Sequence, residues 1–179
     1  MGHRLSKIVT RTGDKGTTGL ATGDRINKSS ARIDAIGEVD ELNCHLGVLL
    51  THELPDSIRA SLSRIQNELF NLGGELAMPP AELIKEEDVA RLEADVEAVN
   101  EGLPPLKEFV LPGGNPPAAA AHMARAVARR VERSLWALNE EEPLNEFAPR
   151  YANRLSDLLF VIARTLARAN GGKEVSWSR

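Results

Sequence analysis

The N-terminal segment concentrates residue types that bind phosphate. The run TRTGDKGTTGL at positions 10–20 combines glycines, which let a backbone approach a ligand closely, with hydroxyl side chains and Lys15. This mixture suits a phosphate cradle. The run is not a Walker A loop, because its order is Asp-Lys-Gly-Thr, no apolar strand precedes it and no helix follows directly. Taken by itself, it is either a phosphate-binding loop or a turn-rich terminus.

A predicted helix from about Pro117 to Asn139 carries a row of arginines. At about 100° per residue, one side of this helix is polar and holds Arg125, Arg129 and Glu132, with Arg130 and Arg133 nearby. The other side is apolar and comprises Met123, Val127, Val131, Leu135 and Leu138. A solvated face with salt bridges is one interpretation. The absence of lysine from the helix favours another, the binding of phosphate or a buried carboxylate, because guanidinium groups are planar bidentate donors.

A second predicted helix, from about Ala148 to Asn170, has a similar arrangement. Its buried side is rich in leucine, and Asn153, Asp157 and Arg164 fall opposite that side. Asp157 is then within reach of Arg154 or Arg164 along the helix. This pattern alone says little about function.

Other kinds of chemistry find little support in the sequence. The histidines at positions 3, 45, 52 and 122 are dispersed, so no protein metal site is predicted. Cys44 is the only cysteine of the chain, which excludes an intrachain disulfide and a multi-cysteine metal centre. No serine stands in a nucleophile elbow. A protein nucleophile is therefore not evident.

The composition predicts one all-α domain. The chain has 179 residues, 42% of them hydrophobic but only 4% aromatic, so its core must consist of aliphatic side chains, which favours packed helices. We expect a single domain over 1–179, formed by a flexible arm at 1–29, a five-helix up-and-down bundle at 30–170 and a tail at 171–179. The clearest helix follows Pro55, where apolar residues recur at steps of four and three: Ile58, Leu62, Ile65, Leu69, Leu72 and Leu76.

The net charge, the apolar runs and the single cysteine limit which partners and which cellular compartment are expected for the chain. The net charge is −4, so the chain lacks the overall positive field of a nucleic-acid-binding protein. No apolar run approaches the ~18–20 residues that span a bilayer. With a lone cysteine and no apolar block at its start, the chain is expected in the cytoplasm.

Five segments together resemble the PduO-type ATP:cob(I)alamin adenosyltransferases. They occur in the family's order and spacing: TRTGDKGTTGL at 10–20, GEVDELN at 37–43, FVLPGG at 109–114, RAVARRVER at 125–133 and NRLSD at 153–157. The resemblance implies a five-helix bundle that forms a homotrimer with active sites between subunits. It also implies transfer of the 5′-deoxyadenosyl group of ATP to the cobalt of a reduced corrinoid, which gives adenosylcobalamin and triphosphate. A corrinoid reductase or a cobalamin-dependent acceptor enzyme is an expected partner.

The resemblance also assigns site residues. The arm is expected to fold over the triphosphate with Thr10, Arg11, Thr12, Gly13, Asp14, Lys15, Gly16, Thr17, Thr18 and Lys28. The helices are expected to complete the ATP site with Arg129, Arg130, Glu132, Arg133 and Asn153. Mg²⁺ is then held mainly by phosphate oxygens.

Three further residues are implied on the corrinoid side of the reaction. Phe109 matches the family's phenylalanine that excludes a lower axial ligand from cobalt, which makes Co(II) easier to reduce; otherwise it is a buried loop anchor. Asp40 and Arg125 match a pair that forms a salt bridge across the subunit interface.

Two other functions remain open at this point: an ATP-dependent corrinoid carrier or sensor, and a helical bundle whose arginine face binds a partner. A generic ATP phosphotransferase is disfavoured.

Overall fold

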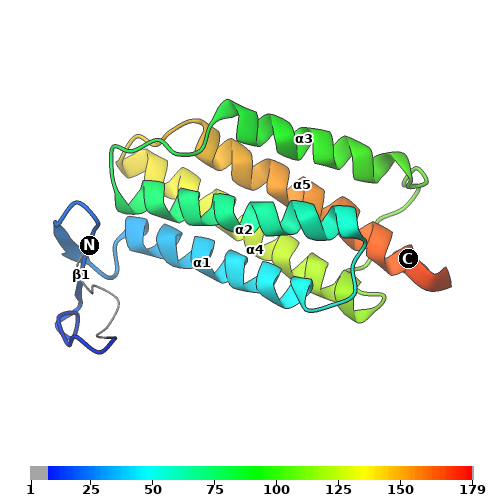
Figure 1. Cartoon of the computed structure of the whole chain (residues 1–179), viewed down its shortest axis with the longest axis horizontal. Coiled ribbons are helices and arrows are strands. Elements are labelled where there is room, and N and C mark those ends of the chain that lie inside the picture. The colour runs from blue at the N-terminus through cyan, green and yellow to red at the C-terminus, as the bar shows by residue number, and fades with distance from the viewer. Residues whose placement is uncertain (1–7, 179) are drawn as a thin grey trace.

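Five helices run alternately up and down side by side in the computed structural model, which describes residues 8–178 (Figure 1). They are α1 (Ala31–Leu50), α2 (Asp56–Ala77), α3 (Glu86–Glu101), α4 (Pro116–Glu141) and α5 (Phe147–Arg168), followed by a 3-10 turn, η1 (Ala169–Gly171). Helix α4 packs against α1 and α5, α2 lies against α1, and α3 lies against α5. The predicted bundle is confirmed. Residues 1–7 of the predicted arm and Arg179 of the predicted tail lie outside the described part of the chain.

Side-chain caps fix where two of the helices begin. Ser30 accepts a hydrogen bond from the backbone N–H of Ile33 at the start of α1. Asn115 does the same for Ala118 at the start of α4, with an Oδ1 to N distance of 3.0 Å. Such caps satisfy backbone donors that a helix start leaves unpaired. The amide of Asn115 also donates to the carbonyl of Leu166 at 2.7 Å, so this cap ties α4 to the end of α5.

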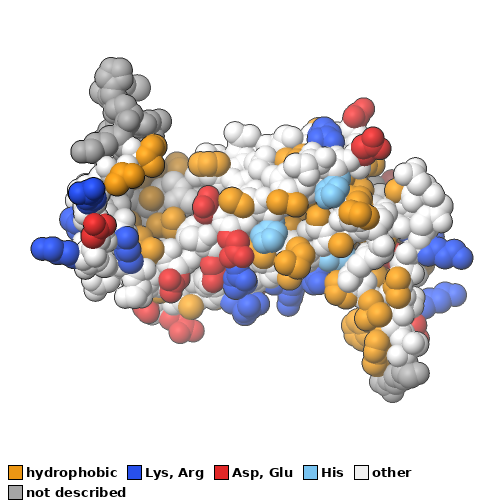
Figure 2. Space-filling view, turned by 90° about the horizontal axis from the view of Figure 1, so that it is seen from below, with side chains coloured by type: hydrophobic (Ala, Val, Ile, Leu, Met, Phe, Trp, Pro, Cys, Tyr) orange, Lys and Arg blue, Asp and Glu red, His pale blue; other side chains and the backbone are white. Residues whose placement is uncertain are grey.

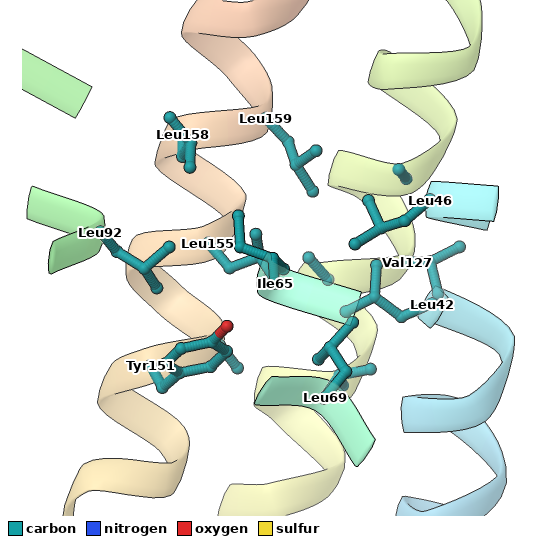
Figure 3. Packing of buried hydrophobic residues seen from close by; sticks show 14 of the residues in the cluster. Leu42, Leu46, Ile65, Leu69, Leu92, Val127, Tyr151, Leu155, Leu158 and Leu159 are labelled. Atoms are coloured by element: carbon teal, nitrogen blue, oxygen red, sulfur yellow. The ribbon is translucent and has the colours of Figure 1, made fainter. Parts of the chain in front are cut away.

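Aliphatic side chains fill the space between the helices. All six apolar residues predicted for the side of α2 are buried. Ile65 of α2 lies between Leu46 of α1 and Leu155 of α5 in this cluster (Figure 3). Burying a side chain of this size contributes about 1.5–3 kcal/mol. None of the helices in the described residues is both long and apolar enough for a membrane span.

The predicted apolar side of α4 is buried at Val127, Val131, Leu135 and Leu138, but not at Met123. Met123 is 56% exposed, whereas Ala121, His122 and Ala124 are buried. The small alanine side chains let α4 approach its neighbours closely, so they share the buried side with the larger residues. The prediction missed them because alanine contributes weakly to an apolar pattern.

The ion pairs that spacing allows between Asp157 and Arg154 or Arg164 are not found among the described residues. Arg154 bonds Glu93 of α3 at 2.8 Å, and Arg164 bonds Glu174 of the tail at 2.5 Å. Asp157 is exposed. Spacing within one helix could not reveal these partners, because they come from elements distant in the sequence.

The arm contains a small β-hairpin that the sequence did not predict. Strands β1 (Thr17–Gly19) and β2 (Arg25–Asn27) are antiparallel, with Thr18 opposite Ile26. The backbone N–H of Ala21 donates to the carbonyl of Ala77 at 2.9 Å, which joins the hairpin turn to the end of α2. Strands of three residues are too short to give a readable alternating pattern.

The C-terminal tail pairs with the connection between α3 and α4. Val110 and Ser176 form an antiparallel bridge. On either side of it, Leu111 N–H donates to the carbonyl of Val175 at 2.8 Å, and Trp177 N–H donates to the carbonyl of Phe109 at 2.7 Å. The tail therefore fixes the backbone of the segment that carries Phe109.

Candidate nucleotide and corrinoid sites

The glycine-rich run of the arm forms a compact turn before β1. Gly16 N–H donates to the carbonyl of Gly13 at 3.1 Å, and Lys28 N–H donates to the carbonyl of Gly16 at 2.9 Å. Gly16 has a φ of 79°, a backbone conformation that favours glycine. Arg11, with a φ of 58°, is also in the left-handed region. The turn presents Thr12, Asp14 and Lys15 to solvent.

Arg25 holds this turn in place, and sequence reasoning missed it. Its Nη2 donates to the carbonyl of Thr12 at 2.7 Å, to the carbonyl of Thr17 at 3.0 Å and to Thr17 Oγ1 at 2.9 Å. One guanidinium thus bridges the two ends of the run 12–17. The residue stands eight positions beyond Thr17, outside the pattern that drew attention to the loop, so only the hairpin reveals it.

Two lysines place positive charge at the turn. A Cβ added at Gly13 would lie 3.0 Å from Nζ of Lys28, so the Lys28 ammonium lies directly against the loop backbone. Lys15 is exposed one residue before Gly16. The turn therefore combines two cations, hydroxyl groups and an accessible backbone, which are the groups that bind a polyphosphate.

On the helices, Asn153 and Glu132 are in contact. Asn153 Nδ2 donates to Glu132 Oε1 at 3.1 Å, and Asn153 Oδ1 accepts from Arg154 Nη1 at 2.5 Å. Arg154 in turn bonds Glu93 of α3 at 2.8 Å. Because a guanidinium only donates and a carboxylate only accepts, this chain of bonds fixes the orientation of the Asn153 amide.

The arginines of α4 divide into two groups. Arg129 and Arg133 are exposed, and Arg133 Nη1 donates to the carbonyl of Arg129 at 3.1 Å. Arg130 instead forms ion pairs with Glu41 and Glu38 of α1. The hydrogen bond from Arg130 to Glu41 lowers the pKa of Glu41 and raises the pKa of Arg130. Within this chain Arg130 therefore joins α4 to α1, whereas Arg129 keeps its guanidinium accessible.

No side-chain hydrogen bond joins the arm loop to the arginine row within residues 8–178. The side-chain hydrogen bonds of the loop stay inside the arm, between Thr10 and Thr12 and from Arg25 to Thr12 and Thr17. Among residues 8–178, none joins the loop to Arg129, Glu132 or Asn153. One chain thus holds two halves of the predicted ATP site, apart from each other.

Phe109 stands over an open pocket of about 410 Å³. Its lining residues are Leu106, Lys107, Glu108, Phe109, Val110, His122, Arg125 and Phe160. Phe109 is 79% exposed, so the interpretation of this residue as a buried loop anchor is wrong. The pocket places an accessible aromatic ring beside the first arginine of the α4 row.

Two polar atoms at this pocket lack partners. Arg125 Nε and His122 Nδ1 are both buried, and neither forms a hydrogen bond within the described residues. Burial and the neighbouring Arg129 charge lower the pKa of Arg125. Burial and the Arg125 charge lower the pKa of His122, against an opposing effect of Glu174. Arg125 as a whole is partly exposed, so an acceptor from outside the chain can reach its guanidinium and satisfy the buried Nε.

Asp40 is an exposed carboxylate on another face. It lines a groove between α1 and α2 together with Asn43, Cys44 and Phe70. No hydrogen bond or ion pair of Asp40 is found among residues 8–178. Its neighbour Asn43 is buried and leaves Oδ1 without a partner. Asp40 and Arg125 therefore do not form a salt bridge inside one chain.

The carboxylates, histidines and cysteine of the described residues do not form a cage for a cation. Groups of three or more such side chains that could hold a metal ion are absent there. An ion that enters with a polyphosphate would therefore take most of its ligands from phosphate oxygens and water.

Comparison with known proteins gives a consistent result. The cobalamin adenosyltransferase family model matches residues 8–166. A cobalamin adenosyltransferase of Cupriavidus metallidurans is 57% identical over 180 residues, covering 100% of this chain and 98% of the relative. A corrinoid adenosyltransferase of Mycobacterium bovis is 43% identical and covers 99% and 95%, respectively.

Solved structures agree with these relatives. A phenylalanine-to-alanine variant of the PduO-type ATP:corrinoid adenosyltransferase of Lactobacillus reuteri, complexed with cobalamin and ATP, superimposes with a TM-score of 0.90. It is 31% identical, and the match covers 97% of this chain and 100% of that one. An arginine-to-lysine variant of the same enzyme, complexed with ATP, gives a TM-score of 0.89. By sequence and by fold, this chain belongs to the cobalamin adenosyltransferase family.

Proposed function

We propose that this corrinoid adenosyltransferase moves the 5′-deoxyadenosyl group of ATP to the cobalt of cob(I)alamin or a related reduced corrinoid. The products are adenosylcobalamin and triphosphate. The observation that carries the proposal is the order of side chains on α4. Arg125 lines the pocket of Phe109, and Arg129 and Glu132 follow at successive turns, about 5.4 Å apart along the axis. In this proposal the corrinoid therefore lies next to the row of side chains that binds the phosphates of ATP.

The reaction needs no nucleophile from the protein. The cobalt electron pair forms a bond to C5′ of the ribose, and the C5′–O bond breaks as triphosphate leaves with its electrons. The protein contributes alignment of the two substrates and stabilisation of the charge that grows on the leaving group. Lys15, Lys28 and Arg129 are suited to the second task, and Mg²⁺ carried by the phosphates would add to it.

In this proposal the nucleotide site is assembled from the two halves described above. The turn at 10–18 and Lys28 surround the triphosphate, and Arg129, Glu132, Arg133 and Asn153 complete the site from the helices. Glu132 has one carboxylate oxygen bonded to Asn153, which leaves the other for the nucleotide. We assign Arg130 a supporting role here, because its guanidinium is already engaged with α1.

Phe109 acts in this proposal as an apolar wedge at cobalt. Exclusion of water and of the lower axial ligand leaves cobalt four-coordinate, which makes the reduction of Co(II) to Co(I) easier. The exposure of the Phe109 ring over an open pocket supports this role. Because most of the ring is exposed, a ligand can reach it.

The unpartnered groups support a homotrimer with shared sites. We propose that Asp40 of one subunit forms a salt bridge with Arg125 of the next, which would satisfy both groups. The face that carries α1 has hydrophobic side chains interspersed with charged ones (Figure 2), and Phe70 and Val48 are among the exposed ones. Exposed aromatic residues such as Phe70 are enriched at protein–protein interfaces.

The chemistry also implies partners. Cob(I)alamin is formed by one-electron reduction of Co(II), so a corrinoid reductase must supply the electron, and a cobalamin-dependent enzyme must accept the product. We propose that the protein works in the cytoplasm, since its lone cysteine, Cys44, is a free thiol.

A single assay tests the reaction. The purified protein is incubated without oxygen with ATP, Mg²⁺ and chemically reduced cobalamin, and the visible spectrum and the phosphate product are recorded. Adenosylcobalamin with triphosphate supports the proposal, whereas ADP or phosphate would indicate another reaction. A folded protein that binds ATP and corrinoid without spectral change would be a carrier or sensor instead.

A further inference from the structure

Arg164 of α5 is a buried guanidinium outside both substrate sites. Its side chain is only 3% exposed, although it was expected on a solvated side of the helix. A charge in this position is costly unless hydrogen bonds and an opposite charge compensate it. The groups that compensate it show what the residue holds together.

The partners of Arg164 come from two separate segments. Its Nε donates to Glu174 Oε1 at 2.5 Å, which ties it to the C-terminal tail. Its Nη2 donates to the carbonyl of Pro104 at 2.8 Å, near the start of the connection between α3 and α4. Arg168, one turn later, adds a bond of 2.9 Å to Glu174 Oε2. Both segments are thus fastened to the same point of α5.

These two segments are the ones that determine where Phe109 stands. Val175, directly after Glu174, accepts from Leu111, and Trp177 donates to the carbonyl of Phe109. The rings of Phe109 and Trp177 meet edge to face, with centroids 6.4 Å apart. Hydrophobic side chains gather on this projecting segment at the C-terminal end (Figure 2).

Phe109 has little support of its own. Its ring is mostly exposed, and its backbone is held by hydrogen bonds to the tail rather than by burial. The tail in turn follows η1 and is fastened to the bundle through Glu174. Displacement of that carboxylate would release the strand that fixes the Phe109 backbone.

The charge state of Glu174 fits such a role. Burial opposes ionisation of the carboxyl, but the hydrogen bonds from Arg164 and Arg168 outweigh it, so the pKa of Glu174 lies below its ordinary value. The carboxylate therefore stays ionised at neutral pH.

We propose that Arg164 and Glu174 are positioning residues of the transfer reaction: their ion pair holds the tail and the loop together so that Phe109 stands over the corrinoid pocket. The inference rests on the proposed role of Phe109. Neither Arg164 nor Glu174 lines the pocket of Phe109. Their ion pair should therefore affect the step that depends on Phe109, the use of cob(II)alamin, more than the binding of ATP.

The test compares Glu174→Gln with Arg168→Gln, and with Arg150→Gln as a matched control. Arg168 and Arg150 lie on the same helix and are about equally exposed, at 44% and 43%, but Arg150 pairs with Glu146, away from the tail. Each variant is assayed with cob(II)alamin plus reductant and with pre-formed cob(I)alamin, and its affinity for ATP is measured. Glu174→Gln should lower the rate from cob(II)alamin by roughly tenfold, a size typical of a lost charge-assisted hydrogen bond, and should lower the rate from cob(I)alamin less.

The double variant shows whether the effect acts through Phe109. In a Phe109→Ala background, Glu174→Gln should cause no further selective loss. An equal loss on both corrinoids, or a full additional loss in that background, would overturn the inference. If Glu174→Gln does not fold, Arg168→Gln decides the question, because its exposed side chain can be changed without opening the core: the same selective loss, in smaller measure, supports the inference, and rates equal to those of Arg150→Gln overturn it.

The outcomes also distinguish a failure of the proposed function from a failure of the positioning role of Arg164 and Glu174. A wild-type protein that forms no adenosylcobalamin from either corrinoid would refute the proposed function. A wild-type protein that is active, with selective loss in Phe109→Ala but not in Glu174→Gln, would refute only the positioning role of the ion pair.

Discussion

The arm and the helical bundle present polar side chains in different ways. In the arm, the turn at 12–17 is held by backbone hydrogen bonds and by the exposed guanidinium of Arg25. In the bundle, Glu132 and Asn153 project from helices whose other sides are buried in the core. Their bond is thus supported by packing that does not depend on a ligand. Residues 8–29, the part of the arm that the structure describes, include no buried residue.

This difference suggests a division of work between the two regions. A loop with exposed hydrogen bonds and few buried contacts opens at low free-energy cost, so it can close over a nucleotide and release triphosphate afterwards. Side chains on packed helices keep their positions while the leaving group develops charge. The bundle should therefore contribute mainly to kcat. The arm should determine the capture of ATP and, once closed, bring Lys15 and Lys28 to the leaving group.

Arg129→Ala should give the largest effect. Loss of a cation that acts on the leaving group is expected to lower kcat by about 10²–10³. Because the side chain is exposed and makes no hydrogen bond among the described residues, the helical circular dichroism spectrum should not change. Retained turnover in this variant would show that the arginine row is only a solvated face.

Phe109→Ala should follow, and it separates the corrinoid pocket from the ATP site. Transfer from cob(II)alamin plus reductant is expected to fall at least about tenfold, with a smaller loss from pre-formed cob(I)alamin, because the wedge assists reduction. The affinity for ATP should stay as in the wild type. Equal losses with both corrinoids would contradict the wedge.

Arg25→Gln tests whether the arm depends on one guanidinium. The variant removes charge-assisted bonds to Thr12 and Thr17, so the KM for ATP should rise by roughly five- to tenfold while kcat changes less. Lys173→Gln, an exposed change of the same charge in the tail, serves as the control. A loss confined to kcat would argue against the division of work between arm and bundle.

Much of the bundle could be predicted because its evidence is local. The apolar steps of α2 specify a buried side, and every one of those positions is buried. What the sequence could not reveal depends on contacts between distant segments. Arg164 was assigned to a solvated side because its partners, Glu174 and the carbonyl of Pro104, come from the tail and a loop. Arg25 was missed because its role exists only once the hairpin folds.

The residues of the candidate site could be predicted from the sequence, but the contacts between them could not. The residues of the arm and of α4 were found from their chemistry and from the ordered family segments. Which of them meet could not be predicted from one chain. The structure brings Glu132 to Asn153 but leaves Asp40 and Arg125 apart and the loop away from Arg129. Completion of the site by a neighbouring subunit stays a prediction.

The smallest expected effect is on stability in acid. It distinguishes the contribution of His122, at the Phe109 pocket, from that of Glu174, in the tail. The pKa of His122 is lowered in the folded protein by burial and by Arg125. Its contribution to the free energy of unfolding is therefore fully present above the pKa of the unfolded state, about 6.5. This contribution is lost as the pH falls through the folded-state pKa, because the unfolded chain binds a proton more readily than the folded one. The pKa of Glu174 is also lowered, so its contribution is lost in the same direction, but only below about 4.5.

Melting temperatures measured from pH 8 to pH 3 resolve the two windows. His122→Gln should flatten the decline in melting temperature that begins below about pH 6.5. It should leave the second decline, below about pH 4.5, unchanged. Glu174→Gln should flatten the lower decline in melting temperature. It should make the upper decline larger, because the Glu174 charge raises the pKa of His122. If His122→Gln leaves the upper decline unchanged, another group causes it. If Glu174→Gln leaves the lower decline unchanged, the tail is not fastened by its ionised carboxylate, which would also weaken its assignment as the group that positions Phe109.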